Sequence, residues 1–272
     1  MSVVDSKVAL VALQGLRQAN TDMNRSAERL ATGLRINQAG DDPAGFGKAS
    51  KLKGEIGSYY QVKRNISDGL SSLGKVGDSL STIADYLVEM RSIALAASAE
   101  TDTGVISNYQ DLLDEYVNSI NDIAADTKWG DDSVLDGTST SETVQTGIDS
   151  GDQKTLTFSS VSAGGLGVSG ITLSSGGSNG IGDIDDAIDD VAGKLAQMGG
   201  YQRSLEGSLD LADSNLIAKS SQYGNIMNAD LALEATNLAA ARIRQDSATA
   251  VLAQANSMNR TIADYLLNGA IG

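Results

Sequence analysis

Three short motifs in this sequence have residue types and a spacing that could support catalysis or nucleotide binding. Residues 69–76 (GLSSLGKV) nearly form a phosphate-binding loop, but Val76 stands where a Ser or Thr hydroxyl must hold Mg²⁺. Residues 165–170 have the glycine spacing of a dinucleotide-binding turn, but no helix is predicted after them. Ser50 and Lys53 have the spacing of a serine–lysine nucleophile without its companion motifs. No catalytic site is therefore predicted.

The composition excludes further classes of function. The chain has no Cys and no His, which removes disulfides, thiolate metal sites, and the commonest general base and metal ligand. Its 35 acidic and 20 basic residues give a net charge of −15, which disfavours binding to nucleic acid. No apolar run of about 18 residues predicts a membrane span, and the N-terminus lacks the pattern of a cleavable signal peptide. We expect no enzyme, cofactor, metal, nucleic-acid partner or membrane insertion.

Four long segments carry residues at alternating steps of three and four positions, the 3.5-residue period of a coiled coil. Two of these seams lie within residues 73–94 and 188–216, and two lie at the chain ends. The N-terminal seam comprises Leu13, Leu16, Asn20, Met23, Ala27, Leu30 and Leu34. The C-terminal seam comprises Leu238, Ala241, Gln245, Ala248, Leu252, Ala255, Asn259, Ile262 and Leu266. The period predicts a long helix in each segment.

The terminal seams are rich in alanine and polar residues. A lone pair of such helices would bury little apolar surface, so it would need neighbouring chains for stability. The polar seam residues either fix the register of the helices or lie at a hydrated edge, and the sequence leaves both open: Asn20, Gln202, Gln245 and Asn259. The core of a monomeric helical bundle is the alternative explanation for the seams.

The remaining signals mark helix starts and a different middle segment. Asp42 followed by Pro43 predicts a capped helix start, Asp230 predicts another, and a third helix is predicted over 105–127. Residues 131–180 are rich in Gly, Ser and Thr, and within them 154–158 and 170–173 alternate like hairpin strands.

Acidic residues are concentrated around the same middle segment. Between residues 131 and 190, Lys154 is the only basic residue against 11 acidic ones. This predicts a solvated, exposed surface. A cation site at residues 183–186 is the alternative, although the glycine and the distal glutamate of an EF-hand loop are missing.

Both ends of the chain resemble bacterial flagellin. The N-terminal match is residues 26–45 (SAERLATGLRINQAGDDPAG), and the C-terminal match is residues 251–256 (VLAQAN) followed by Ile262 and Leu266. Residues 229–234 (ADLALE) are similar to the hinge of that family. The matches agree in order, spacing and predicted helix, and they bracket the chain.

The resemblance implies a mainly α fold with long antiparallel coiled-coil-like helices formed by both chain ends and a small β-hairpin-rich insert in the middle. It implies a terminal helical domain at the filament axis (1–36 plus 226–272), a long-helix domain (37–136 plus 181–225) and an exposed insert (137–180). The non-alanine residues of the two terminal seams would form the interfaces between subunits.

The implied function is that of a structural subunit, which self-assembles into the helical bacterial flagellar filament used for motility. The implied location is secreted and extracellular, after export without a cleaved signal. The implied partners are other copies of the chain, a flagellar export chaperone, and the cap and hook-associated proteins.

Some positions depart from the family pattern. Residues 1–7 differ from the usual flagellin start, and residues 268–272 follow Leu266 and Leu267 where chains of the family often end at Leu-Leu-Arg. Flagellins sensed by Toll-like receptor 5 carry an Arg-x-Arg-x-x-Leu-like patch, and the corresponding candidate residues here are Glu89, Arg91, Ile93 and Glu115. Because Glu89 reverses a charge of that patch, we expect weak activation of the receptor.

Three other functions compete with the filament subunit. The first is the hook–filament junction protein of the same superfamily, which self-assembly into long fibres would distinguish. The second is a soluble helical enzyme, which would need a set of convergent catalytic groups that the sequence lacks. The third is an adhesin whose exposed insert binds a surface, a role compatible with filament formation.

We expect Leu252→Asp to leave the monomer soluble but to stop polymerisation, because it would place a charge in an apolar seam. Electron microscopy of the purified variant under polymerising conditions is the measurement. Normal filaments would contradict the placement of Leu252 at a subunit interface.

Overall fold

The computed structural model describes residues 3–268, and the side chains of all of these except residues 3–6, 259 and 262–268. The helices are α1 (Val3–Thr32), α2 (Pro43–Ala99), α3 (Thr103–Asp126), α4 (Ile181–Met227) and α5 (Leu231–Asn268). The strands are β1 (Lys128–Trp129), β2 (Asp132–Ser133), β3 (Ser141–Gln145) and β4 (Gln153–Thr157). The predicted mainly α fold with a small β insert is confirmed.

The chain forms two compact units. We call residues 1–54 with 219–272 the terminal unit and residues 55–218 the central unit. The domains expected from the sequence differ from these units: the terminal domain was expected to comprise 1–36 and 226–272, and residues 137–180 were expected to form a separate insert. In the structure, apolar residues of that insert, such as Leu156 and Val168, belong to the same buried cluster as the long helices of the central unit.

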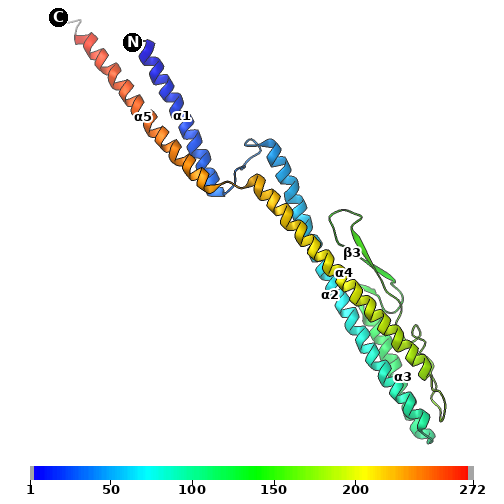
Figure 1. The fold of residues 1–272 in the computed structure, drawn as a ribbon. Coiled ribbons are helices and arrows are strands. Elements are labelled where there is room, and N and C mark those ends of the chain that lie inside the picture. Colours follow the sequence, from blue (N-terminus) through cyan, green and yellow to red (C-terminus); the bar gives the residue numbers. More distant parts are fainter. Residues whose placement is uncertain (1–2, 269–272) are drawn as a thin grey trace. The chain divides into compact units, whose positions relative to one another are not determined.

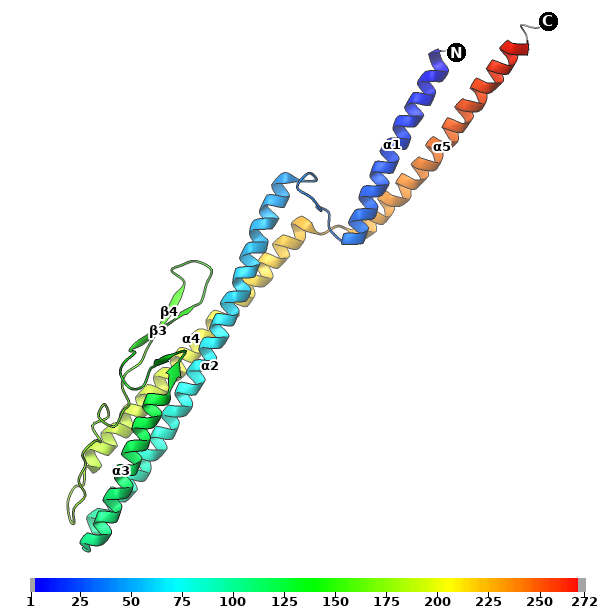
Figure 2. The same ribbon diagram turned by 180° about the vertical axis from the view of Figure 1, so that it is seen from behind.

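In the terminal unit, α1 and α5 lie side by side and antiparallel, so that the start of α1 and the end of α5 are at the same end of the pair (Figure 1, Figure 2). The most buried positions repeat at multiples of seven residues along both helices: Ala12, Ala19, Ser26, Glu234, Ala241 and Ala255. Most of these side chains are small, so they allow the two helices to approach closely, but they bury little apolar area.

The ends of the paired helices are joined by backbone hydrogen bonds between the two connecting segments. Gly33 ends α1 with a φ of 70°, a left-handed conformation that glycine adopts without steric cost. The Arg35 N–H donates to the carbonyl of Met227 at 2.6 Å, and the Ala229 N–H donates to the carbonyl of Gly33 at 2.9 Å. Ile36 and Met227 bury their side chains in a small core beside this bridge.

The start of α2 confirms the predicted cap. The Asp42 carboxylate accepts the Gly45 N–H at 2.9 Å, and Pro43 occupies the first helical position, where no donor is needed. Asp230 likewise caps α5 by accepting the N–H groups of Ala232 and Leu233 at 3.0 and 3.1 Å.

The core of the central unit is built largely from aliphatic side chains of α2, α3 and α4. The predicted seam on α2 is confirmed, since every member is buried: Leu73, Val76, Leu80, Ile83, Leu87, Met90 and Ala94. On α4 the apolar seam residues are buried or half-buried, whereas Gln202 is exposed and donates to Glu206 on the same helix. Asp102 caps the start of α3, and its carboxylate accepts the N–H groups of Gly104 and Val105.

The middle segment contains one of the two predicted strands. Residues 154–158 correspond to β4, which pairs antiparallel with β3 in the register Glu142 opposite Leu156. The prediction of a strand at 170–173 is wrong. Ile171 and Leu173 are buried there, but their backbone partners are the side-chain amide groups of Gln110 on α3, at 3.0 and 2.8 Å. Buried and exposed residues alternate here as they do in a strand, which explains the prediction. The side chain of Gln110 forms the backbone hydrogen bonds that a neighbouring strand would otherwise form.

A side chain at Gly45 would crowd two side chains at the start of α2. A Cβ atom there would come within 2.8 Å of Ile36 Cδ1 and would also overlap the Asp42 carboxylate. A Cβ atom at Gly47, two positions later, would project into open space. We expect Gly45→Ala to lower the free energy of unfolding by about 1–3 kcal/mol through overpacking.

The matched control is Gly47→Ala, which we expect to raise the free energy of unfolding by roughly 0.5–1 kcal/mol because alanine favours the helix. Urea unfolding followed by circular dichroism measures both variants. Equal effects of the two substitutions would contradict the steric role of Gly45.

Candidate functional site

The candidate site is the paired α1 and α5, where most of the sequence-predicted interface residues lie. On α1, the side chains of Leu16, Met23 and Leu30 are half-buried against α5. The seam that faces α5 contains Ala12, Ala19 and Ser26 at its most buried positions, where the sequence had placed Leu13, Asn20 and Ala27. Every second position of the predicted N-terminal seam therefore lies one residue away from the position that is buried in the structure.

The displacement changes what the predicted residues do. Leu13 is 39% exposed and Ala27 is exposed, so neither packs into the pair within the chain. Leu34 is half-buried in the connecting segment, beside the small core of Ile36 and Met227. The small residues of the buried row permit a closer approach of the helices than Leu13 would, which is the physical reason for the shift.

On α5 the predicted period agrees with the burial. Leu238, Gln245 and Leu252 are half-buried toward α1, and Ala241 and Ala255 are buried. The predicted interface residues Asn259, Ile262 and Leu266 lie outside the side chains that the structure describes.

Two polar contacts cross between the helices near the middle of the pair. The amide of Gln245 donates to Asn20 Oδ1 at 2.7 Å, and both side chains are partly buried. Arg244 Nη1 donates to Asp22 Oδ2 at 2.9 Å. A partly buried amide pair with one partner on each helix loses its hydrogen bond if the helices slip, so it favours a single register.

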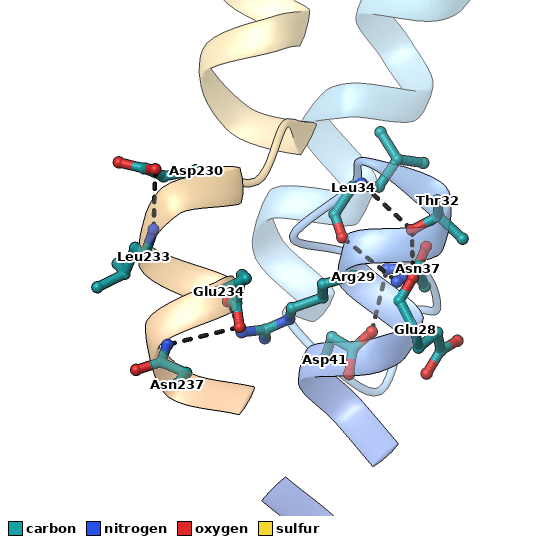
Figure 3. Close-up of polar contacts among 10 residues, drawn as sticks. All are labelled: Glu28, Arg29, Thr32, Leu34, Asn37, Asp41, Asp230, Leu233, Glu234 and Asn237. Carbon is teal, nitrogen blue, oxygen red and sulfur yellow. Dashed lines mark hydrogen bonds and ion pairs between the residues drawn. The ribbon is translucent and has the colours of Figure 1, made fainter. Parts of the chain in front are cut away.

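A further polar cluster lies where α1 ends and α5 begins (Figure 3). Arg29 Nη1 contacts Glu234 Oε1 at 2.9 Å, and only 7% of the Glu234 side chain is exposed. Burial by itself raises the pKa of Glu234, but hydrogen bonds from Arg29, Ser26 and Asn237 outweigh burial, and the pKa lies below its ordinary value. The ionised carboxylate is therefore the form that the folded pair stabilises.

The loop between α1 and α2 is held by a second carboxylate. Asp41 Oδ2 accepts the backbone N–H groups of Gln38 and Asn37 at 3.1 and 3.0 Å, and these bonds lower the pKa of Asp41. The Asn37 amide in turn donates to the carbonyl of Leu34 at 3.3 Å (Figure 3). The polar residues of the 26–45 segment thus build the end of the helical pair.

The outward faces of the pair carry many exposed apolar side chains, most of which the sequence-based predictions did not include. They are Val8, Leu10, Val11, Leu13, Leu231, Leu233, Ile243, Val251 and Met258. Ile243 and Val11 are 66% and 65% exposed. A groove of about 430 Å³ between the helices is lined mainly by apolar and small residues, among them Val8, Val11 and Val251. The signal that could have revealed these residues is the apolar character of positions next to the seam, which a soluble helix would keep polar.

The four residues of the candidate receptor patch differ in their exposure to solvent. Glu89 on α2 and Glu115 on α3 are exposed, whereas Ile93 is buried at 8% exposure in the core of the central unit. Arg91 is exposed but bound, since its Nε lies 2.5 Å from Asp185 Oδ1, and this pairing raises the pKa of Arg91.

The described part of the chain shows little that suggests chemistry on a small molecule. Among the described side chains, no three or more carboxylates cluster so that they could hold a metal ion. Within residues 3–268, no helix combines the length and the apolar character that crossing a bilayer requires. The features that stand out are surfaces: an apolar pair of terminal helices and a separate compact unit.

Two family models match the sequence. The model of the bacterial flagellin N-terminal helical region matches residues 4–140, and the model of the bacterial flagellin C-terminal helical region matches residues 181–266. The first covers nearly all of α1 and the whole of α2 and α3, and the second covers α4 and nearly all of α5.

Curated relatives match over almost the whole chain. A flagellin of Halalkalibacterium halodurans is 30% identical over 270 residues, which cover 94% of this chain and 97% of the relative. Flagellin FljM of Caulobacter vibrioides is 29% identical over 265 residues, covering 96% and 97%. A solved Vibrio parahaemolyticus structure, described as a putative flagellar hook-associated protein, shares the fold with a TM-score of 0.58 at 17% identity, covering 69% of this chain and 100% of that one.

The buried carboxylate of Glu234 predicts a pH-dependent contribution to stability. Because the folded pKa lies below the ordinary value of 4.5, the contribution is fully present above that value and is lost as the pH falls through the folded pKa. We expect Glu234→Gln to lower the free energy of unfolding at pH 7 by about 1–2 kcal/mol, and the deficit to shrink as the pH falls below 4.5.

Urea unfolding of both proteins from roughly pH 3 to pH 7 measures this difference. The control is Glu28→Gln on α1, whose side chain is exposed and for which we expect a change within about 0.5 kcal/mol at each pH. A deficit of Glu234→Gln that does not vary with pH would rule out the ionised contact as its cause.

Proposed function

This chain belongs to the bacterial flagellin family and is a structural subunit of the flagellar filament, and from that premise we propose that its paired terminal helices are the surface through which the copies polymerise. In this proposal the outward apolar side chains of α1 and α5 pack against the same helices of neighbouring copies. The polymer is extracellular, as the family implies.

The observation that carries the proposal is the imbalance within the terminal unit. The inner seam of α1 and α5 buries mostly alanine and serine, while leucine, valine and isoleucine side chains such as Leu10, Val11 and Ile243 remain exposed. Burial of one such side chain stabilises an assembly by about 1.5–3 kcal/mol. A surface of this kind on a soluble chain favours protein–protein association.

Assembly through this surface would also stabilise the helical pair. A helical pair with a shallow core gains stability from any partner that binds only its folded form. Contacts between different patches of successive copies generate an open helical polymer, whereas a self-complementary patch would stop at a dimer. The partly buried Asn20–Gln245 contact would hold the register in which the outer faces are presented.

The remaining roles follow from family membership. We propose that the half-buried residues of the predicted seams, Leu16 and Leu252 among them, stabilise the pair that neighbouring copies then cover. The middle segment would face solvent in the filament, with its hairpin held against α4 by Tyr201 at the Thr157 backbone. Export through the flagellar channel, an export chaperone, and contact with cap and hook-associated proteins belong to the same proposal.

The hook-associated protein of the same superfamily is the second candidate, because the fold likeness to the Vibrio parahaemolyticus structure does not distinguish the two roles. The two candidates differ in their self-assembly. A filament subunit forms long fibres by itself at sufficient concentration, whereas a junction protein forms a short layer of limited size.

We expect Ile243→Asp to abolish filament formation while leaving the helix content and the unfolding transition of the monomer unchanged, because Ile243 is 66% exposed in the single chain. Sedimentation and electron microscopy of the polymerised protein are the measurements.

The matched control is Ile243→Leu, which keeps an apolar side chain of similar volume and should polymerise as the wild type does. Filaments from Ile243→Asp with a normal critical concentration would remove the outward face of α5 from the proposed interface.

A further inference from the structure

The charges of the chain are divided unequally between its two units. The terminal unit contains 12 basic and 9 acidic residues, a net charge of +3, whereas the central unit contains 8 basic and 26 acidic residues, a net charge of −18. The net charge of −15 is therefore the sum of a weakly basic unit and a strongly acidic unit. Opposite charges on two surfaces of one chain attract when those surfaces belong to different copies.

The basic side can be traced to the start of α2. Lys48 and Lys53 are exposed there, and neither forms a hydrogen bond or an ion pair within the part of the chain that the structure describes. Two arginines of the terminal unit, in contrast, form ion pairs within the chain: Arg29 binds Glu234 and Arg244 binds Asp22. The two lysines are thus positive charges whose partner is not supplied within the described chain.

The acidic side has a counterpart at the start of α4 in the central unit. Of the aspartates in its first turns, Asp185 and Asp190 are paired with Arg91 and Lys194. The others are exposed and make no ion pair or side-chain hydrogen bond with any described residue: Asp183, Asp186 and Asp189. Steps of three positions place them along one side of the helix.

We propose that Lys48 and Lys53 of one copy contact Asp183, Asp186 and Asp189 of the next copy, so that charge pairing sets the direction in which subunits add. The contact joins two different patches, so it is heterologous and propagates along a polymer without closing. This inference rests on the proposed function, because it requires that copies meet in a filament.

Charge complementarity favours a second copy of the chain as the partner of Lys48 and Lys53, which we call the basic patch. A nucleic acid or an anionic membrane would have to approach a chain whose net charge is −15, and the central unit would repel it. The acidic unit of another copy carries the opposite charge at high density and is present at the same concentration. Polymerisation also brings many copies together, which strengthens contacts that are weak one by one.

The first test compares two double variants that change the net charge equally. Lys48→Glu with Lys53→Glu reverses the basic patch, and Lys128→Glu with Lys154→Glu reverses two exposed lysines of the central unit. Both pairs of substitutions lower the net charge by the same amount, so general repulsion between copies is matched.

We expect the first double variant to raise the critical concentration for polymerisation about three- to tenfold over the control at a salt concentration of roughly 0.05 M. The difference should vanish near 1 M salt, where charges are screened within roughly 3 Å. Circular dichroism and urea unfolding of each monomer show whether its fold is unchanged.

The second test restores the contact by exchanging the charges. A triple variant with Asp183→Lys, Asp186→Lys and Asp189→Lys should polymerise poorly alone, because like charges meet at every contact. Mixed in equal amounts with the Lys48→Glu, Lys53→Glu variant, it should form filaments in which the two variants alternate. Differential labels and electron microscopy measure the co-assembly.

The outcomes separate this inference from the proposed function. Wild-type filaments together with equal effects of the two double variants, or no co-assembly of the charge-exchanged pair, would overturn the contact alone. A wild-type chain that forms no filament at any salt concentration would contradict the proposed function itself.

Discussion

The close approach of two helices through very small side chains is the constraint on which the terminal unit depends. Ala12, Ala19 and Ser26 on α1 face a row on α5 that contains Ala241 and Ala255. Such a seam brings backbones near each other, yet each pair of side chains removes little apolar surface from water. Many larger apolar residues of the same helices, such as Val11 and Ile243, are exposed, and in the proposed assembly neighbouring copies would bury them.

The central unit has the opposite design. Its helices bury complete rows of leucine, isoleucine and valine, and the middle segment adds further apolar side chains to the same core, including Leu156 and Val168. Specific polar contacts fix the segment in place, such as the pairing of the Gln110 amide with the backbone of Ile171 and Leu173. This unit also carries all of the surplus negative charge. In the proposed filament, contacts with neighbouring copies would therefore add stability mainly to the terminal unit.

Polar residues in the terminal unit act mainly on geometry. The Asn20–Gln245 and Arg29–Glu234 contacts join α1 to α5 at defined positions, and Asp41 and Asp42 shape the turn into α2. Exposed ion pairs add little stability, but a buried carboxylate with several donors strongly disfavours any register that separates it from them. Because the register of the pair determines which apolar residues face outward, these contacts also fix the pattern of the surface that we propose neighbouring copies cover.

The sequence by itself determined the helical segments, their caps at Asp42 and Asp230, the buried row of α2 and the family, because these depend on local period, local turn chemistry and segment identity. It did not determine which residues of α1 face α5. Apolar residues occupy adjacent positions along α1, and their period indicates an apolar side of the helix but not the element that this side contacts. Only the tertiary structure decided that Ala12, not Leu13, lies inside, that Ile93 is buried, and that residues 170–173 bond to Gln110 instead of a strand. Each of these choices depends on how closely distant segments approach, and that distance is set by packing between elements.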